Sequence, residues 1–253
     1  MSGETSDRFL GKTEDYKKFR PSYPLEIFQY LKQEHNLLES KICAEIGSGT
    51  GKFCELLIQN NNTVFAVEPN AEMRLAAEKS LGKFKSFISV NGNSENTTLK
   101  SQSVDFIFCA QSLHWFANEK TAKEMSRILK PHGKVVIVWN KKDYEKSSFM
   151  KGIHKIFIED CIDFLSVKLE NIPDDEILSS LFTEKYQSFS IASKQILNLE
   201  GLFGRMQSAS YAPPENHPKY KKFRSEIENL FKKEEKKGTV EFLYETVTYV
   251  FTF

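Results

Sequence analysis

Glu45-Ile46-Gly47-Ser48-Gly49-Thr50-Gly51 is the stretch that decides the fold, because three alternate glycines separate an apolar run from a helical pattern. Residues 41–46 form a short and mostly apolar run, which is typical of a strand buried in a parallel sheet. Beyond the last glycine, Phe53, Leu56 and Leu57 recur at helical spacing. Glycine accepts positive φ and has no Cβ, so a ligand can approach the main-chain N–H groups. The stretch therefore predicts a nucleotide-cofactor loop between a strand and a helix.

The spacing of the glycines distinguishes two classes of cofactor. The dinucleotide fingerprint is G-x-G-x-x-G, whereas Gly51 comes one residue early. Glu45 lies two residues before the first glycine, where a carboxylate repels a pyrophosphate but attracts the amino group of a cationic ligand. An acidic residue followed by G-x-G-x-G resembles the first motif of the class I S-adenosylmethionine-dependent methyltransferases. The resemblance implies that the donor binds at Glu45 and the three glycines, Gly47, Gly49 and Gly51.

A second carboxylate, Glu68, ends the β-branched and aromatic run 63–67. An acid at the carboxyl end of the second strand can accept both ribose hydroxyls of an adenosine, in dinucleotide and methyltransferase folds alike. The alternative role of Glu68 is a charge at a helix N-terminus, which the helix dipole favours.

The following segments continue the alternation of strands and helices. A helical pattern runs to Leu81, strand-like runs occupy 86–90 and 104–110, and a helix over 121–129 precedes the apolar run 134–139. Such alternation implies parallel pairing and right-handed crossovers, with ligands at the carboxyl ends of the strands.

The end of the chain predicts a helix and a last strand. Residues 218–237 place apolar side chains along one helical face, and residues 239–253 are strongly β in character. Similarity to the methyltransferases implies that this strand runs antiparallel and completes a seven-stranded, mostly parallel sheet. The predicted fold class is therefore α/β, doubly wound and Rossmann-like, with a helical insert or cap.

Length and composition fit one elaborated domain. The chain has 253 residues, of which 40% are hydrophobic and 27% charged, enough for a sizeable core. We expect a single methyltransferase domain over 1–253, with an N-terminal lid arm at 9–24, a core at 25–140 and an insert at 141–198. The insert lacks clear periodicity and lies where similar enzymes shape the acceptor pocket.

Charge and cysteine content narrow the classes of partner. With a formal net charge of only +1, the chain has no overall positive field that would attract nucleic acid or anionic lipid. No apolar run reaches transmembrane length, and residues 1–7 lack the core of a signal peptide, so we expect a cytoplasmic protein. The four cysteines have no metal-ligand spacing, and no metal is expected. The oligomeric state stays open.

Two loops after predicted strands resemble the family further. Residues 91–95 match a segment that contacts adenine, which implies donor contacts by Asn93, Ser94 and Glu95, with the Asn93 carbonyl accepting from the adenine amino group. A plain loop of Asn, Gly and Ser would need no such function. Residues 110–116 match the Ala-x-x-x-His-Trp-Phe pattern of methyltransferase type 11 enzymes, which include trans-aconitate methyltransferase-like and ubiquinone-biosynthesis-like members.

The second of these loops lies where donor and acceptor meet in that family. The resemblance implies a donor contact by Gln111 and an acceptor pocket that includes His114 and Trp115. Aromatic rings exclude water and offer π faces to a sulfonium. His114 either orients the acceptor or takes a proton; alternatively, it bonds backbone and packs the start of a helix.

The N-terminal arm carries a further match, because residues 16–24 copy a Tyr-x-x-x-Arg-Pro-x-Tyr-Pro leader. Its prolines stiffen the segment. The resemblance implies that three residues of the arm cover the methionine end of the donor and border the acceptor: Tyr16, Arg20 and Tyr23. Arg20 would form hydrogen bonds with a carboxylate. The alternative is an arm strapped over the sheet by its aromatic rings.

A late pattern, Gly-x-x-x-Arg-x-x-Ser-x-Ser-Tyr, matches residues 201–211 and adds Arg205 and Tyr211 to the acceptor pocket. Arg205 suits an acceptor carboxylate, unless it pairs with a surface acid. His114, Arg20 and Arg205 are thus the candidate catalytic residues. The expected function is methyl transfer from S-adenosylmethionine to a small molecule, possibly a carboxylate. The alternatives are an NAD-dependent oxidoreductase and a non-catalytic nucleotide-cofactor-binding protein.

Overall fold

The computed structural model describes residues 19–162, 164, 178, 181, 182 and 185–252. Its strands are β1 (Ile42–Ile46), β2 (Thr63–Val67), β3 (Phe87–Val90), β4 (Val104–Ala110), β5 (Leu129–Lys142), β6 (Tyr186–Leu197) and β7 (Val240–Thr252). Its helices are α2 (Glu26–His35), α3 (Lys52–Gln59), α4 (Ala71–Leu81), α5 (Glu119–Ile128), α6 (Ser148–Asp160), α8 (Leu199–Gln207) and α9 (Tyr220–Glu234), with the 3-10 turn η2 (Leu113–Trp115).

The strands form one seven-stranded sheet in the order β3-β2-β1-β4-β5-β7-β6. Strands β1 to β5 pair in parallel, whereas β7 pairs antiparallel with both β5 and β6. The predicted fold class, a doubly wound and mostly parallel sheet with an antiparallel last strand, is confirmed. The carboxyl ends of β1, β2 and β4 therefore meet at one edge, where the glycine loop lies.

Two strands differ from the sequence-based expectation. Strand β5 begins at Leu129 rather than at Lys134, because Leu129 already pairs with Val104 before a register shift. Strand β6 lies in the segment 141–198, in which the sequence shows no clear periodicity, and it pairs with β7 over its whole length. The segment 141–198 therefore supplies an edge strand of the main sheet as well as helix α6. The domain boundaries drawn from the sequence stay a prediction.

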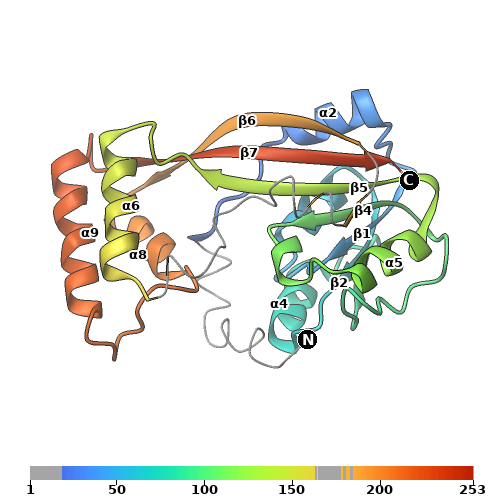
Figure 1. The fold of residues 1–253 in the computed structure, drawn as a ribbon, viewed down its shortest axis with the longest axis horizontal. Helices are drawn as coiled ribbons and strands as arrows, with labels where there is room; N and C mark the ends of the chain where they lie inside the picture. The colour runs from blue at the N-terminus through green and yellow to red at the C-terminus, as the bar shows by residue number, and fades with distance from the viewer. Residues whose placement is uncertain (1–18, 163, 165–177, 179–180, 183–184, 253) are drawn as a thin grey trace.

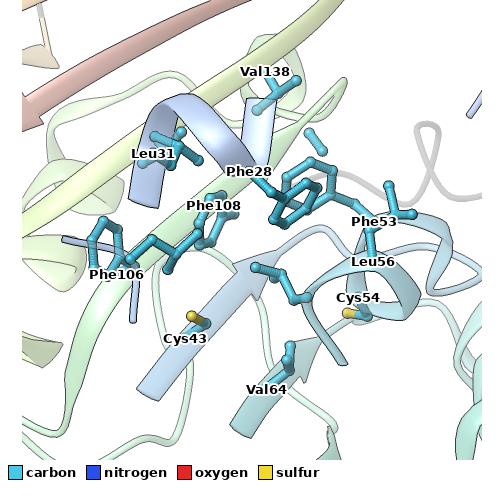
Figure 2. Close-up of a cluster of buried hydrophobic side chains, with 14 of the residues drawn as sticks. Phe28, Leu31, Cys43, Phe53, Cys54, Leu56, Val64, Phe106, Phe108 and Val138 are labelled. Carbon is cyan, nitrogen blue, oxygen red and sulfur yellow. The ribbon is translucent and has the colours of Figure 1, made fainter. Parts of the chain in front are cut away.

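Helices cover both faces of the parallel strands, because alternate strand residues point to opposite faces. On one face, Phe106 and Phe108 of β4 pack with Phe28 and Leu31 of α2 and with Phe53 of α3 (Figure 2). On the other face, a second cluster joins the alternate residues of β4 and β5 to α5. Each fully buried Phe or Leu contributes about 1.5–3 kcal/mol relative to an exposed side chain, so these clusters fix the loops at the sheet edge.

A third core lies outside the parallel part of the sheet. Helices α6, α8 and α9 gather at one end of the long strands β5, β6 and β7, away from α4 and α5 (Figure 1). Their apolar side chains pack with the start of β7 in a separate cluster. We call these three helices the helical lobe. In the part of the chain that the structure describes, no helix is long and apolar enough to cross a membrane.

Candidate active site

The glycine loop turns the chain from β1 into α3. Gly47, Gly49 and Gly51 all have positive φ, at +70°, +55° and +81°. A Cβ on Gly47 would lie 2.8 Å from Ser112 Cβ, and one on Gly51 would lie 2.7 Å from a Leu81 methyl carbon. A Cβ on Gly49 would meet only the sulfur of Met73, at 3.8 Å. Packing therefore requires glycine at the two outer positions, whereas a Cβ at Gly49 would make only an ordinary van der Waals contact.

Glu68 holds this loop in place. Its Oε2 accepts from the N–H of Gly49 and its Oε1 from the N–H of Asn70, each at 2.8 Å. Burial raises the pKa of Glu68, although these two N–H groups and Arg74 act against the rise. The N-terminus of α4 is capped by the Asn70 side chain, which accepts from the N–H of Met73. Glu68 therefore bonds the glycine loop, and its remaining lone pairs suit ribose hydroxyls.

If the donor is S-adenosylmethionine, as the resemblance implies, replacing Glu68 by alanine is expected to weaken its binding by about 1.5 to 3 kcal/mol, because charge-assisted hydrogen bonds are lost. Glutamine should recover only part, since an amide offers one acceptor oxygen where the carboxylate offers two. Titration calorimetry measures both affinities. Glu72→Ala is the matched control, because Glu72 is an exposed acid in the first turn of α4. If Glu68→Ala kept wild-type affinity, the ribose role would be wrong.

Glu45 lies under the loop and is almost fully buried. The thiol of Cys54 donates to Glu45 Oε2 at 2.8 Å. Burial, and to a lesser extent the charge of Glu68, raise the pKa of Glu45 to about 8 against the lowering effect of Cys54. The carboxyl group is therefore protonated at neutral pH. A ligand ammonium beside it would lower its pKa, so that the group would lose its proton when the ligand binds. The donor contact of Glu45 stays a prediction.

The segment after β3 has internal partners for its polar side chains. Asn93 Oδ1 accepts from the N–H groups of Glu95 and Asn96, both at 2.9 Å. Thr121 Oγ1 lies 3.1 Å from Ser94 Oγ, and a Glu95 oxygen accepts from the amide of Asn118 at 3.1 Å. The geometry is that of an Asx turn, which matches the plain-loop alternative. Both lone pairs of the Asn93 oxygen are thus engaged, so the predicted adenine bond requires this turn to rearrange.

The loop after β4 places His114 against two indoles. Its ring centroid lies 4.5 Å from that of Trp115 and 5.0 Å from that of Trp139. Neither ring nitrogen of His114 has a hydrogen-bond partner among the described residues, so the expected alternative of a backbone-bonded histidine is not seen there. Burial, and then the charge of Arg20, lower the pKa of His114 to about 3.

Gln111, in the same loop, has a φ of +57°, and its side-chain amide donates to the carbonyl of Asn140 at 3.2 Å.

The described part of the N-terminal arm connects the glycine loop to the helical lobe. Arg20 Nη2 donates to the carbonyl of Ser208, just after α8, at 2.9 Å. The ammonium of Lys52, the first residue of α3, donates to the carbonyl of Arg20. Tyr23 is partly buried and packs edge-on against Phe53, with ring centroids 5.0 Å apart, at the margin of the core. Its place in the acceptor pocket stays a prediction. Tyr16 lies outside the described residues.

Arg205 of α8 is buried, with only 2% of its surface exposed. Its Nε donates to the Tyr244 hydroxyl at 2.7 Å, and that hydroxyl donates to Gln195 at 2.8 Å. The guanidinium carbon lies 5.2 Å from the Phe242 ring centroid. Its Nη1 has no hydrogen-bond partner among the described residues, and none of their carboxylates forms an ion pair with it. The expected alternative, pairing with a surface acid, is therefore not found in the described part of the chain.

Lys142, at the end of β5, is a residue of this region that sequence reasoning missed. Its ammonium donates to the Tyr211 hydroxyl at 3.0 Å and lies 5.3 Å from the Phe157 ring centroid. The sequence offered no signal, because the prediction ended strand β5 at Trp139. Among the described residues, no cluster of three or more His, Cys, Asp or Glu side chains could hold a metal ion. Lys142, Arg20 and Arg205 interact electrostatically, and aromatic rings surround the Lys142 ammonium.

Comparison with known proteins assigns this arrangement to a family. Residues 44–137 match the family described as the methyltransferase domain. A methyltransferase-like protein of Schizosaccharomyces pombe is 31% identical over 244 residues, which cover 93% of this chain and 91% of the relative. A second methyltransferase of that yeast is 36% identical over 130 residues, 51% of each chain.

A solved structure shows the same fold. It is a protein from Anaeromyxobacter dehalogenans assigned as a type II methyltransferase, with a TM-score of 0.64 and 16% identity over 92% of this chain and 96% of that one.

The chain belongs to the class I S-adenosylmethionine-dependent methyltransferases, as the relative that is 31% identical over 93% of this chain shows. It is an enzyme whose methyl donor is S-adenosylmethionine, and this replaces the two alternatives of an oxidoreductase and a non-catalytic binding protein.

Proposed function

We propose that the enzyme transfers the methyl group of S-adenosylmethionine to a carboxylate of a small molecule, and that Arg205 binds the acceptor. The observation that carries this proposal is the buried Arg205 guanidinium, with an Nη1 that no described residue satisfies. A buried charge without an ionic partner costs several kcal/mol, which an anionic ligand offsets on binding. A planar guanidinium suits a carboxylate in particular.

The residues at the glycine loop suit S-adenosylmethionine as the bound donor. Among the described residues, no side chain covers the main chain of Gly49, which has no Cβ of its own, more closely than the sulfur of Met73, 3.8 Å from where a Cβ would lie, and Glu68 retains acceptor capacity toward the ribose. When bound, S-adenosylmethionine supplies an activated methyl group on a sulfonium. The proposed donor contacts are Arg20, Glu45, Gly47, Gly49, Gly51, Glu68, Asn93, Ser94, Glu95 and Gln111, together with Tyr16 of the arm.

On the acceptor side, the protein has to align the carboxylate with the methyl group of the donor, and it does not have to remove a proton. A carboxylate already carries the attacking lone pair, so no general base is required. Arg205 and Arg20 would hold the anion, while Trp115 and the neutral ring of His114 exclude water from the reacting atoms. Tyr211 would close the pocket on the side of the helical lobe, and Tyr23 of the arm would border the acceptor.

A panel of matched compounds tests this function. Purified enzyme and methyl-labelled donor are incubated with small carboxylic acids and with the primary amide and alcohol of each. We expect label to be transferred to carboxylic acids, and not to their uncharged analogues, because only the anion pairs with Arg205. Turnover of alcohols or amines, with no carboxylic acid accepted, would contradict the proposal.

The pH profile supplies a prediction about His114. Its pKa is lowered to about 3, so the ring is neutral throughout the range from pH 5 to 8. We therefore expect the kcat/KM of wild-type enzyme for a carboxylate to show no acidic limb near the ordinary histidine pKa of about 6.5. His114→Ala should reduce kcat about tenfold or less, through lost packing. An acidic limb near 6.5 that vanished in His114→Ala, with kcat lowered roughly 10² to 10⁴-fold, would instead identify a base.

A further inference from the structure

Cys54 joins the start of helix α3 to strand β1 beside the glycine loop. It is the third residue of α3, which begins directly after Gly51. Its thiol donates to Glu45 Oε2 at 2.8 Å, and both side chains are buried. We propose that Cys54 is a positioning residue of the donor site, whose thiol holds the Glu45 carboxyl group in place for the ammonium group of S-adenosylmethionine. This proposal rests on the donor contact of Glu45 proposed above.

The side chain of Glu45 points into the layer between the sheet and α3. Side chains alternate between the two faces of a strand, and the neighbours Ala44 and Ile46 lie in the core on the α5 side. Cys43, on the other face of β1, packs in the same core as Cys54, together with apolar side chains of α2 and α3 (Figure 2). Glu45 is therefore an acid inside an apolar layer, one residue before β1 ends and the glycine loop begins.

Among the described residues, Cys54 supplies every hydrogen-bonding group that acts on the Glu45 carboxyl group. The thiol has the larger effect and the backbone N–H of Cys54 the smaller, and both favour the ionised carboxylate. No described cation forms an ion pair with Glu45, and the charge of Glu68 opposes its ionisation. The carboxylate oxygens keep lone pairs for a ligand, and an ammonium group is the ligand group that compensates this buried charge.

The bond from Cys54 fixes the direction of the carboxyl group before the donor binds. A glutamate side chain has several rotatable bonds, and a hydrogen bond at its end restricts them. The thiol belongs to α3, the helix that the glycine loop opens, so the carboxyl group and the loop are held by the same element. Preorganisation of this kind reduces the entropy lost on binding. Loss of the thiol should therefore weaken ligands that carry the ammonium group and spare ligands that lack it.

Donor binding is coupled to the proton of Glu45. Burial raises the pKa of Glu45 to about 8 in the free enzyme, and the ligand ammonium lowers it in the complex, so binding releases this proton to solvent. Donor affinity therefore rises with pH between the two pKa values, by up to about tenfold per pH unit, and levels off above the free pKa. The described titratable groups that act here are Cys54 of α3 and Glu68 after β2, with Cys43 of β1 acting on Cys54 and Glu45 acting on Cys109 of β4.

Two substitutions of Cys54 separate the hydrogen bond from packing, with titration calorimetry of adenosylhomocysteine over a range of pH. Cys54→Ala removes the donor, so it should raise the Kd about three- to tenfold at pH 7 and move the levelling point of the affinity to higher pH. Cys54→Ser supplies a stronger donor, so the affinity should recover and the levelling point should move to lower pH. Cys43→Ala is the matched control, because Cys43 is a buried thiol of the same core that bonds the carbonyl of Lys41 and not Glu45. It should keep the wild-type profile.

A ligand without the ammonium group isolates the effect on Glu45. 5′-Methylthioadenosine keeps the adenosine and the sulfur of the donor but lacks the amino-acid part. Its affinity should show no rise with pH, and Cys54→Ala should change it by less than about twofold. Glu45→Gln should remove the rise with pH for adenosylhomocysteine. The ammonium of free adenosylhomocysteine titrates in the same way with every variant, so differences between variants report on Glu45.

The outcomes separate this proposal from the proposed methylation of carboxylates, because no acceptor is present. An unchanged Kd and levelling point in Cys54→Ala, or an equal loss of affinity for methylthioadenosine, would overturn the role of Cys54. If Cys54→Ala does not fold, wild-type enzyme and Cys54→Ser decide, since affinity for adenosylhomocysteine that is independent of pH between 6 and 8 in both would also overturn it. Turnover of alcohols or amines in place of carboxylates would reject the proposed acceptor and leave these binding results in force.

Discussion

Gly49→Val is expected to abolish binding of S-adenosylmethionine and adenosylhomocysteine. The residue has a φ of +55°, which valine rarely adopts, and the added side chain would stand beside the main chain that the donor is proposed to contact. The same change would displace the N–H that donates to Glu68 at 2.8 Å. For wild-type enzyme, a ligand at 100 times its Kd adds about 2.7 kcal/mol of stability, which raises the Tm by about 5 to 10 °C. We expect no such shift in the variant.

Gly238→Val is the matched control for backbone strain. Gly238 has a φ of +77°, and a Cβ there would meet no atom within 4 Å. It lies between α9 and β7, outside the glycine loop. Both variants should therefore lose stability through strain, but Gly238→Val should keep the full ligand-induced shift in Tm. Tight donor binding by Gly49→Val would mean that the donor does not approach this part of the loop.

Arg205→Met should raise the KM for a carboxylate acceptor by about 10² or more, because a charged donor to the acceptor contributes roughly 1.5–3 kcal/mol per hydrogen bond. The free energy of unfolding should stay equal or increase, since methionine removes a buried charge with an unsatisfied Nη1. Tyr244 retains its bond to Gln195 in the variant. Steady-state kinetics and denaturant unfolding measure the two effects on the same samples.

Two further variants complete that experiment. Arg205→Lys should recover only part of the affinity, because an ammonium lacks the planar pair of donors. Arg224→Met is the surface control, since Arg224 is exposed and bonds Glu228 on its own helix; it should leave KM unchanged. If Arg205→Met lost stability but kept the wild-type KM, the residue would serve the lobe and not the acceptor.

The parts of the enzyme that depend on local sequence were predictable. The glycine loop and Glu68 follow from short spacings and strand ends, and the structure brings them together through the bond between Gly49 and Glu68. The parallel pairing of the strands, although not their order in the sheet, followed from the alternation of apolar runs with helices. Such features need only a few neighbouring residues to specify them.

The acceptor side depends on contacts between distant segments. Arg205 meets Tyr244 across 39 positions of sequence, and Lys142 meets Tyr211 across 69. Strand β6 was largely missed because its pattern of alternating exposure shows only against its partner β7. The Asx turn at Asn93 uses an oxygen that the sequence assigned to adenine. Spacing along the chain carries no information on such pairings.

The chemical stability of the transferred label tests the central claim most directly. Enzyme, methyl-labelled S-adenosylmethionine and the accepted compound are incubated, and the purified product is then treated with dilute alkali. A methyl ester is hydrolysed, so a carboxylate acceptor predicts that the label is released as volatile methanol. Label that stays bound to the product in alkali, as in an N-, C- or ether O-methyl compound, would contradict the account.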